Sequence, residues 1–472
     1  MGGVRLAAGV AVLAFVTAWP GTATRVFADT IESALVRAYQ SNPQLNAQRA
    51  AVRATDESVP QALSGYRPRV AVTASGGYQY TDITVSQGLP DQGLVGNVQA
   101  RIHGARNPRA IGASVSQTLF DGFQAANRTR AAEGQVSAAR EGLRVLEQTV
   151  LLAAATIYMD YLRDAAIVEV QRSNVRVLEE TLKQTRDRFN VGEVTRTDVA
   201  QSEAQLAAGR TQLMATESTL ITTRANFRRI VGNEPGQLAP GSPVDRFLPS
   251  TLAGSVDLAL TQNPNVTAAM YGIDVSHLQV KVAEGVLFPT VTLQANVQKG
   301  YDQQLTLPGQ LIASAIAQVS VPIYQGGAEY SLIRQSKETL AQQRLNLEQV
   351  RNQARASTVQ AWGQLEATKV QVKSAQAQVE ASEIAVNGIR EEAKAGQRTT
   401  FDVLVAQQTL VSARVALVTA QHDRVVASYS VLNAVGRLTP QVLKLNTTVY
   451  DPSVHYHQVR DSWVGLRTPD GQ

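Results

Sequence analysis

Two long runs without proline, residues 123–191 and 327–395, constrain the fold of this chain more than any other feature. At 1.5 Å per residue, a helix of that length would extend for about 100 Å. Such a helix needs packing partners along its whole length. In the first run, apolar residues recur every three or four positions, the spacing of one helix face. They are Leu143, Leu146, Val150, Ala154, Ile157 and Tyr161, then Val175, Leu178 and Leu182.

Both runs end in the same short pattern. Gly192 and Gly396 each follow the end of a run, and each is followed by a [Ser/Thr]-x-x-[Asp/Glu] pattern that ends at Asp198 or Asp402. Glycine commonly ends a helix, and the second pattern is a capping box that begins one. The sequence therefore predicts two tight helical hairpins, with return helices that extend to residues 231 and 435.

The segments before the long runs are also related to each other. Pro43 and Pro264 occupy the same place in SNPQL and QNPNV, and the separation between Pro68 and Pro289 equals that between Pro43 and Pro264. We therefore predict an internally duplicated chain, in which Pro60 bends the leading helix of the first copy. The predicted units are a first structural repeat over 29–236 with hairpin 123–231, a linker over 237–249, a second repeat over 250–440 with hairpin 327–435, and a C-terminal tail over 441–472.

A pair of strands is predicted in each repeat, between the leading and long helices. Apolar and polar residues alternate there, as in Val291, Leu293 and Ala295. Alternation is typical of outer-membrane barrel strands, and also of a half-buried soluble sheet. The predicted strands are 66–81 and 109–121 in the first repeat, and 289–301 and 311–324 in the second.

Four strands are too few to close a barrel, and lipid does not tolerate open sheet edges. We therefore expect several copies to combine, three giving twelve strands or two giving eight. The second repeat is shorter than the first in the loop between its strands, 302–310 against 81–109. Outer-membrane barrels accept insertions in their extracellular loops.

Residues 1–28 are predicted to be a secretory signal peptide, cleaved after Ala28 or after Ala23. The longest apolar stretch of the remaining chain, 150–159, is too short for a transmembrane helix. The formal net charge is +5, and no Lys/Arg run is interleaved with aromatic residues, so nucleic-acid binding is not expected.

The sequence contains no catalytic motif, and we expect neither enzyme activity nor a cofactor. The absence of cysteine excludes zinc-thiolate and cysteine-nucleophile chemistry. The five histidines are scattered. His455-Tyr456-His457 is a weak metal candidate in a tail that we otherwise expect to be solvated. This tail either covers the waist, the level at which the two shorter helices of each repeat are expected to meet, or contacts a partner.

Across residues 29–440 the chain resembles the TolC family of outer-membrane efflux and secretion proteins. The resemblance rests on SNPQL, the proline before each first strand, FNVG followed by TDV, and RTTFDVL. It implies an α+β membrane protein that forms a homotrimer. A twelve-stranded outer-membrane β-barrel, with four strands from each chain, would be continuous with a long periplasmic α-helical barrel.

The implied function is the exit channel of a tripartite efflux pump or a type I secretion system in a Gram-negative outer membrane. Such a channel passes small molecules or unfolded protein to the exterior. The implied partners are outer-membrane lipid, a periplasmic adaptor protein and an inner-membrane transporter of the ABC or proton-driven kind. The alternative is a periplasmic adaptor, but adaptors usually carry one hairpin and this chain is predicted to carry two.

By resemblance, the hairpin tips close the tunnel. Asp402 then lies at the constriction, and Val405 occupies the position where some members have a second aspartate. Arg398 would link neighbouring hairpins, with Asp198 as its partner. The alternative is that both aspartates are only helix caps, which the helix dipole favours.

Overall fold

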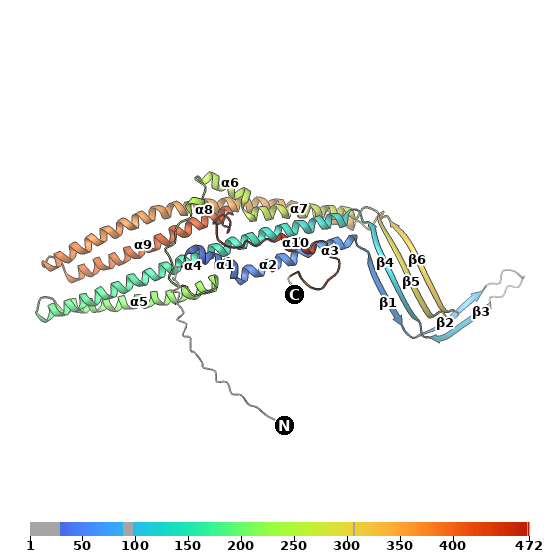
Figure 1. The fold of residues 1–472 in the computed structure, drawn as a ribbon, viewed down its shortest axis with the longest axis horizontal. Coiled ribbons are helices and arrows are strands. Elements are labelled where there is room, and N and C mark those ends of the chain that lie inside the picture. Colours follow the sequence, from blue (N-terminus) through green and yellow to red (C-terminus); the bar gives the residue numbers. More distant parts are fainter. Residues whose placement is uncertain (1–28, 88–97, 305–306, 470, 472) are drawn as a thin grey trace, which may run out of the picture.

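A computed structural model describes residues 29–87, 98–304, 307–469 and 471. The predicted signal peptide, residues 1–28, lies outside them. The described chain is elongated, with helices over most of its length and a sheet at one end (Figure 1).

Two helical hairpins form the half of the molecule distant from the sheet. Each long helix has 67 residues and each return helix has 36, and the antiparallel partners pack together throughout. The first hairpin is α4 (Gln124–Asn190) with α5 (Arg196–Val231), and the second is α8 (Ala328–Lys394) with α9 (Thr400–Val435). The helices therefore begin and end within a few residues of the predicted positions.

Shorter helices complete the length of the long ones on the sheet side. The helices α2 and α3 pack on α4, while α7 packs on both α4 and α8. The break between α2 and α3 is the predicted bend. In a continuous helix, the ring of Pro60 would clash with the carbonyl of residue 56. The bounds are α1 (Ile31–Ser41), α2 (Pro43–Asp56), α3 (Ser58–Leu63), η1 (Ser64–Tyr66), η2 (Asp245–Phe247), α6 (Leu252–Gln262), α7 (Pro264–Gly285) and α10 (Ser453–Val459).

The largest apolar core lies at the waist. It contains residues of α1, of the middle of α4 and of the end of α9. Tyr158 is buried there, and its hydroxyl donates to the carbonyls of Asp29 and Ala239 at 2.8 and 2.6 Å. Leu443 and Leu445 belong to the same core. The first part of the tail therefore covers the waist, one of the two positions that the sequence left open.

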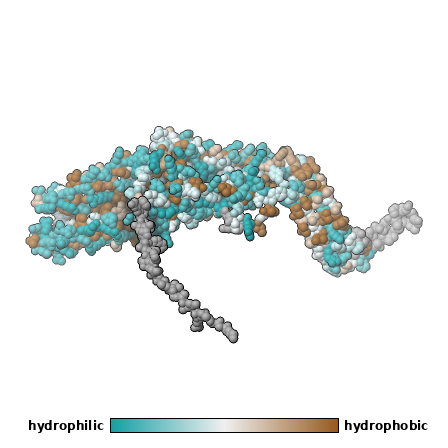
Figure 2. Space-filling view, viewed as in Figure 1, coloured by the Kyte–Doolittle hydropathy of each residue, from teal (hydrophilic) through white to brown (hydrophobic). Residues whose placement is uncertain are grey.

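The sheet contains four antiparallel strands in the order β1-β4-β5-β6. Its pairing places Val72, Ala113, Val297 and Ala313 side by side. The predicted apolar positions of all four strands share one face, and the polar positions share the other. That apolar face is exposed in the single chain, as the brown region of Figure 2 shows. The bounds are β1 (Arg69–Gly76), β4 (Arg109–Phe120), β5 (Thr290–Gln304) and β6 (Leu307–Ser320).

The connection between β1 and β4 differs from the predicted loop. It forms a separate two-stranded ribbon, in which β2 (Gln79–Gln87) pairs with β3 (Val98–Arg106). The predicted strand 66–81 therefore combines the end of η1, all of β1 and the start of β2. The consecutive glycines 76 and 77 separate the two strands, because glycine weakens a strand and permits a sharp change of direction.

We expected no segment after the signal peptide to have the length and composition of a membrane helix. For α9 this expectation is wrong. Helix α9 contains an 18-residue window with a mean hydropathy of 1.4 and few charges. Small and uncharged polar residues interrupt the apolar residues of α9, so this helix contains no long uninterrupted apolar run. Helix α9 packs against α8 and α4, and a core helix has the same composition.

Candidate functional site

The two hairpin tips have the same turn. Gly192 and Gly396 have φ angles of +82° and +78°. Added Cβ atoms would meet nothing within 4 Å, so the left-handed backbone, not lack of space, requires glycine. Each turn is closed by two backbone hydrogen bonds to the end of the long helix, such as Gly192 N to Phe189 O at 3.0 Å.

A complete capping box begins each return helix. The Oδ2 atom of Asp402 accepts from the backbone N and the hydroxyl of Thr399 at 3.0 and 2.9 Å, and Asp198 has the same contacts with Thr195. These hydrogen bonds stabilise the charged carboxylate and hold the pKa of both aspartates below the ordinary value. Within one chain, Asp198 and Asp402 are therefore helix caps, as the alternative interpretation expected.

Arg398 forms an ion pair inside its own hairpin. Its Nε lies 2.9 Å from Oε2 of Glu392, and this pair raises the pKa of Arg398. The first hairpin has the opposite arrangement, with Arg188 on the long helix and Glu193 in the turn, 3.0 Å apart. Among the described residues of one chain, Arg398 and Asp198 do not meet. Their contact stays a prediction about neighbouring chains.

Val405 lines a groove between the two return helices. The groove has a volume of about 400 Å³, and Phe401 and Leu404 line it from α9 while Gln205 lines it from α5. Nε2 of Gln205 donates to Oε1 of Gln408 across it at 3.3 Å. The sequence did not indicate Phe401 or Gln205 as site residues. The one available signal was Phe401, a large apolar side chain next to a helix cap.

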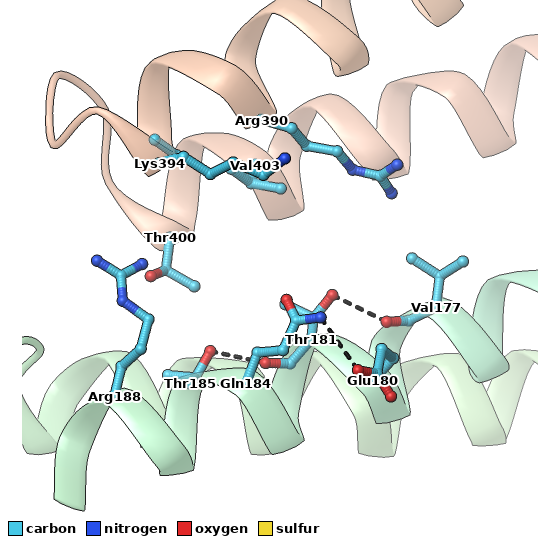
Figure 3. A pocket seen from close by; sticks show the side chains of 11 residues that line it. Val177, Glu180, Thr181, Gln184, Thr185, Arg188, Arg390, Lys394, Thr400 and Val403 are labelled. Atoms are coloured by element: carbon cyan, nitrogen blue, oxygen red, sulfur yellow. Dashed lines mark hydrogen bonds between the residues drawn. The ribbon is translucent and has the colours of Figure 1, made fainter. Parts of the chain in front are cut away.

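A second groove separates the two tips and is lined by three basic side chains (Figure 3). It has a volume of about 420 Å³ and lies between the end of α4 and the α8/α9 turn. Arg188, Arg390 and Lys394 line it, with Glu180 as the one carboxylate. Arg390 also donates to Oε1 of Gln407 at 3.1 Å. Sequence reasoning missed this groove because its two walls belong to different repeats of the chain.

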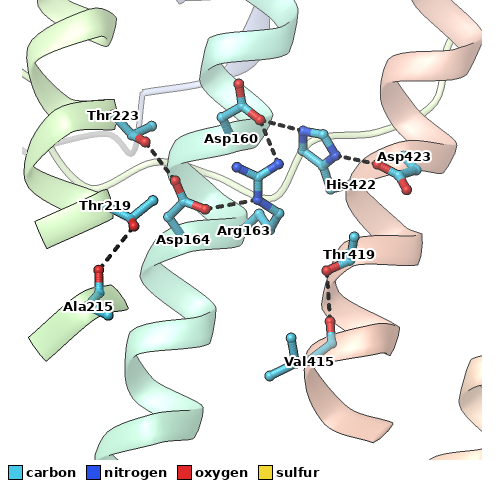
Figure 4. Close-up of polar contacts among 10 residues, drawn as sticks. All are labelled: Asp160, Arg163, Asp164, Ala215, Thr219, Thr223, Val415, Thr419, His422 and Asp423. Atoms are coloured by element: carbon cyan, nitrogen blue, oxygen red, sulfur yellow. Dashed lines mark hydrogen bonds and ion pairs between the residues drawn. The ribbon is translucent and has the colours of Figure 1, made fainter. Parts of the chain in front are cut away.

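A polar cluster joins the two hairpins further from the tips (Figure 4). His422 on α9 lies 2.9 Å from Asp160 on α4 and 2.8 Å from Asp423. Arg163 pairs with both Asp160 and Asp164, each at 2.8 Å. Thr223 on α5 donates to Asp164 at 2.7 Å. The cluster therefore connects α5, α4 and α9; we call it the interhairpin cluster.

The neighbouring carboxylates determine the direction of the pKa shift of His422. Burial lowers its pKa, but the contacts with Asp160 and Asp423 outweigh burial and leave the pKa above 6.5. Three carboxylates surround one guanidinium here, so the surroundings favour the protonated form of the histidine, which adds a second positive charge. No local pattern indicates this role, because His422 and Asp160 are far apart in the chain.

The expectation of a solvated tail is wrong for His455, although His457 and residues 460–469 are exposed. His455 is buried, and its Nδ1 lies 3.0 Å from Oδ2 of Asp56, which is fully buried on α2. This contact gives the buried side chain of Asp56 a polar partner in addition to Arg140, whose Nη2 lies 3.9 Å from Oδ1 of Asp56. Among the described residues, no group of three or more His, Cys, Asp or Glu side chains is placed to hold a metal ion.

The comparisons agree on one family. The model of the outer membrane efflux protein family matches residues 34–233 and 255–437. The outer membrane efflux protein BepC of Brucella suis biovar 1 (strain 1330) is 39% identical over 456 residues, covering 96% of this chain and 95% of that protein. The outer membrane protein TolC of Escherichia coli (strain K12) is 26% identical over 454 residues, covering 89% and 85%.

A solved channel shares the fold. The crystal structure of the Campylobacter jejuni CmeC outer membrane channel superposes with a TM-score of 0.74 at 15% identity, covering 91% of this chain and 89% of that one. The family match extends through both helical hairpins and their tips. The chain therefore belongs to the outer membrane efflux protein family, and it is an outer-membrane protein of a Gram-negative bacterium.

Proposed function

We propose that this chain forms a homotrimeric exit channel with a twelve-stranded barrel. The observation that carries the proposal is the four-stranded sheet, which has an exposed apolar face and ends in two edge strands, β1 and β6. Unpaired edges are not stable in lipid, so each β1 must pair with the β6 of another copy. Three copies give twelve strands, enough to enclose a lumen.

The polar face of the sheet would line that lumen. The helical hairpins would continue it as a tunnel into the periplasm. The equal lengths of the two hairpins and their identical caps support the internal duplication predicted from the sequence, and six hairpins in a trimer would surround the tunnel end symmetrically. In this arrangement the tips are the gate. Asp402 and Val405 line the constriction, and Arg398 contacts Asp198 of a neighbouring chain.

Family members work with periplasmic adaptors and inner-membrane transporters. We propose the same partners for this chain, with a transporter of the ABC or proton-driven kind. The cargo would be small molecules in a tripartite efflux pump, or unfolded protein in a type I secretion system. The alternative of a periplasmic adaptor has no support from the two hairpins or from the family match.

Disulfide trapping tests the trimer directly, because the chain has no cysteine of its own. Val72 on β1 and Ala313 on β6 are at the same level of the sheet through Ala113 and Val297. Because barrel closure staggers neighbouring strands, Val72→Cys is combined in turn with a cysteine at each same-face position of β6, namely Leu311, Ala313, Ala315, Ala317 and Val319, and oxidation of the matching pair in cells should give covalent trimers. Each single-cysteine variant is the matched control. Monomers alone from every pair, or dimers as the largest product, would contradict the proposal.

A further inference from the structure

The end of the chain is fixed against the helices that lead to the sheet. The short helix α10 packs on α2. His455 contacts Asp56 as described above, and Val459 is buried. The guanidinium of Arg140 lies over the ring of Tyr456, 5.0 Å from the ring centre. The direction of the following residues is therefore set by packing within the chain.

The next residues reach the base of the sheet. Nη1 of Arg67 donates to the carbonyl of Ser462 at 2.6 Å, and its guanidinium lies 4.7 Å from the ring centre of Trp463. Arg67 is two residues before β1. The carbonyl of Tyr66 accepts from Nε2 of Gln117 on β4 at 2.6 Å. Trp463 is thus held where the helices meet the strands.

This segment exposes its apolar side chains. Trp463, Val464 and Leu466 are 67%, 91% and 103% exposed. Adjacent exposed apolar residues usually mark a surface that something else covers. Other exposed apolar side chains occur at each helix–strand junction of the sheet, namely Tyr66, Phe123, Phe288, Ile323 and Tyr324.

Basic residues accompany the exposed apolar ones. Arg67 lies against Trp463, while Arg460 and Arg467 lie on either side of it in the sequence and are exposed. Tryptophan and tyrosine favour the boundary between lipid headgroups and acyl chains, where one end of the side chain is wet and the other apolar. Arginine near that boundary attracts anionic phospholipid.

We propose that residues 460–468 form an interfacial anchor that inserts Trp463, Val464 and Leu466 into the periplasmic leaflet of the outer membrane. This inference rests on the proposed placement of the sheet in the membrane, since Arg67 ties the anchor to the first residues of β1. The anchor fixes the depth of the junction between barrel and tunnel. It also gives the three exposed apolar side chains of this segment an apolar environment.

Tryptophan fluorescence tests the proposal, because the chain has three tryptophans, Trp19, Trp362 and Trp463. In Trp19→Phe/Trp362→Phe protein, Trp463 is the sole fluorophore. The protein is placed in nanodiscs that contain phosphatidylglycerol and lipids brominated near the headgroup. We expect the emission to fall at least about twofold relative to unbrominated discs, because an interfacial side chain lies among the first acyl carbons. Arg67→Gln and the replacement of phosphatidylglycerol by a neutral lipid should each reduce this quenching.

Two controls make the outcome decisive. Trp19→Phe/Trp463→Phe protein keeps Trp362, a partly buried side chain on α8. Its emission should be independent of bromination. In the chain without natural tryptophans, Val72→Trp reports whether the exposed apolar face of the sheet meets lipid.

Quenching of both Val72→Trp and Trp463 supports the anchor. Quenching of Val72→Trp without quenching of Trp463 overturns the anchor alone, including the case in which a neighbouring copy covers Trp463 and shifts its emission to the blue. No quenching at either position contradicts the proposed sheet placement itself.

Discussion

The two hairpins have the same lengths and caps but bury opposite helices. In the first hairpin the long helix α4 is the buried partner, with 23 buried residues against 6 on its return helix α5. In the second hairpin the long helix α8 has 12, and its return helix α9 has 15 over about half the length. Helices α4 and α9 therefore form the inside of the single chain, while α5 and α8 present their surfaces outward.

This difference indicates how copies would meet. Helix α8 exposes Leu345, Val370 and Ile384, and α5 exposes Met214 and Ile221. In a ring of chains, the α8 of one copy would face the α5 of the next. Val370 and Ile221 lie at nearly the same distance along their helices from the hairpin tips, so the two would meet at one height.

The largest expected effect comes from breaking this outer contact. Val370→Asp should abolish trimers, because assembly would bury three unpaired carboxylates, one from each copy. Gln371→Asp, at an exposed position about 100° around the helix from Val370, is the matched control and should assemble normally. SDS-resistant oligomers measured without heating distinguish the two. Normal trimers from Val370→Asp would show that α8 does not form the interface.

A smaller effect is expected from removing the interhairpin cluster. His422→Leu removes the partner of Asp423 and leaves Asp160 with Arg163 alone, and we expect a loss of about 2 kcal/mol in the free energy of unfolding. The pH dependence has a definite sign. Because the pKa of His422 is raised in the folded protein, its contribution is complete below pH 6.5 and is lost as the pH rises through the raised value.

Thermal unfolding at pH 6 and pH 9 measures this contribution. The parent should lose more stability than His422→Leu between these two values, while Thr419→Val on the same helix should behave like the parent. An equal loss in the parent and His422→Leu would mean that His422 does not stabilise the contact between the hairpins.

The next prediction separates the two capping aspartates by function. Asp198→Ala and Asp402→Ala remove equivalent caps and should lower stability by similar small amounts. Only Asp402 is proposed to face the axis, where three carboxylates would bind multivalent cations. Planar-bilayer conductance with a trivalent cation on the periplasmic side should show block in the parent and in Asp198→Ala, and little block in Asp402→Ala. Undiminished block in Asp402→Ala would leave it a helix cap only.

The smallest effect concerns the reversed ion pairs. Arg398→Ser should raise single-channel conductance by loosening the closed tip. Arg188→Ser should not, because Arg188 occupies the position of Glu392 in the first hairpin and is not proposed to contact a neighbouring chain. Both variants should assemble as the parent does, since exposed ion pairs contribute little to stability. Equal conductance changes in the two variants would argue against a specific tether.

The hairpins could be predicted because their signals are local. Absence of proline, a left-handed glycine and a capping box lie within the segment that they organise. The apolar sheet face could be predicted for the same reason, from a period of two. The ribbon β2/β3 was missed although its strands alternate, with Ile83 opposite Ile102 and Asp82 opposite His103, because the extra length of the first repeat was interpreted as a loop. The groove beside Arg188, the cluster around His422 and the pairing of His455 with Asp56 join distant segments, and a single sequence contains no signal for such contacts.

Native mass spectrometry of the full chain in detergent tests the central claim, the closed trimer, most directly. We expect one dominant species with the mass of three chains, because four strands per copy leave two edges that three copies close. Val370→Asp should remove this species while Gln371→Asp keeps it. A stable monomer or dimer of the parent chain as the dominant species would contradict the trimeric channel.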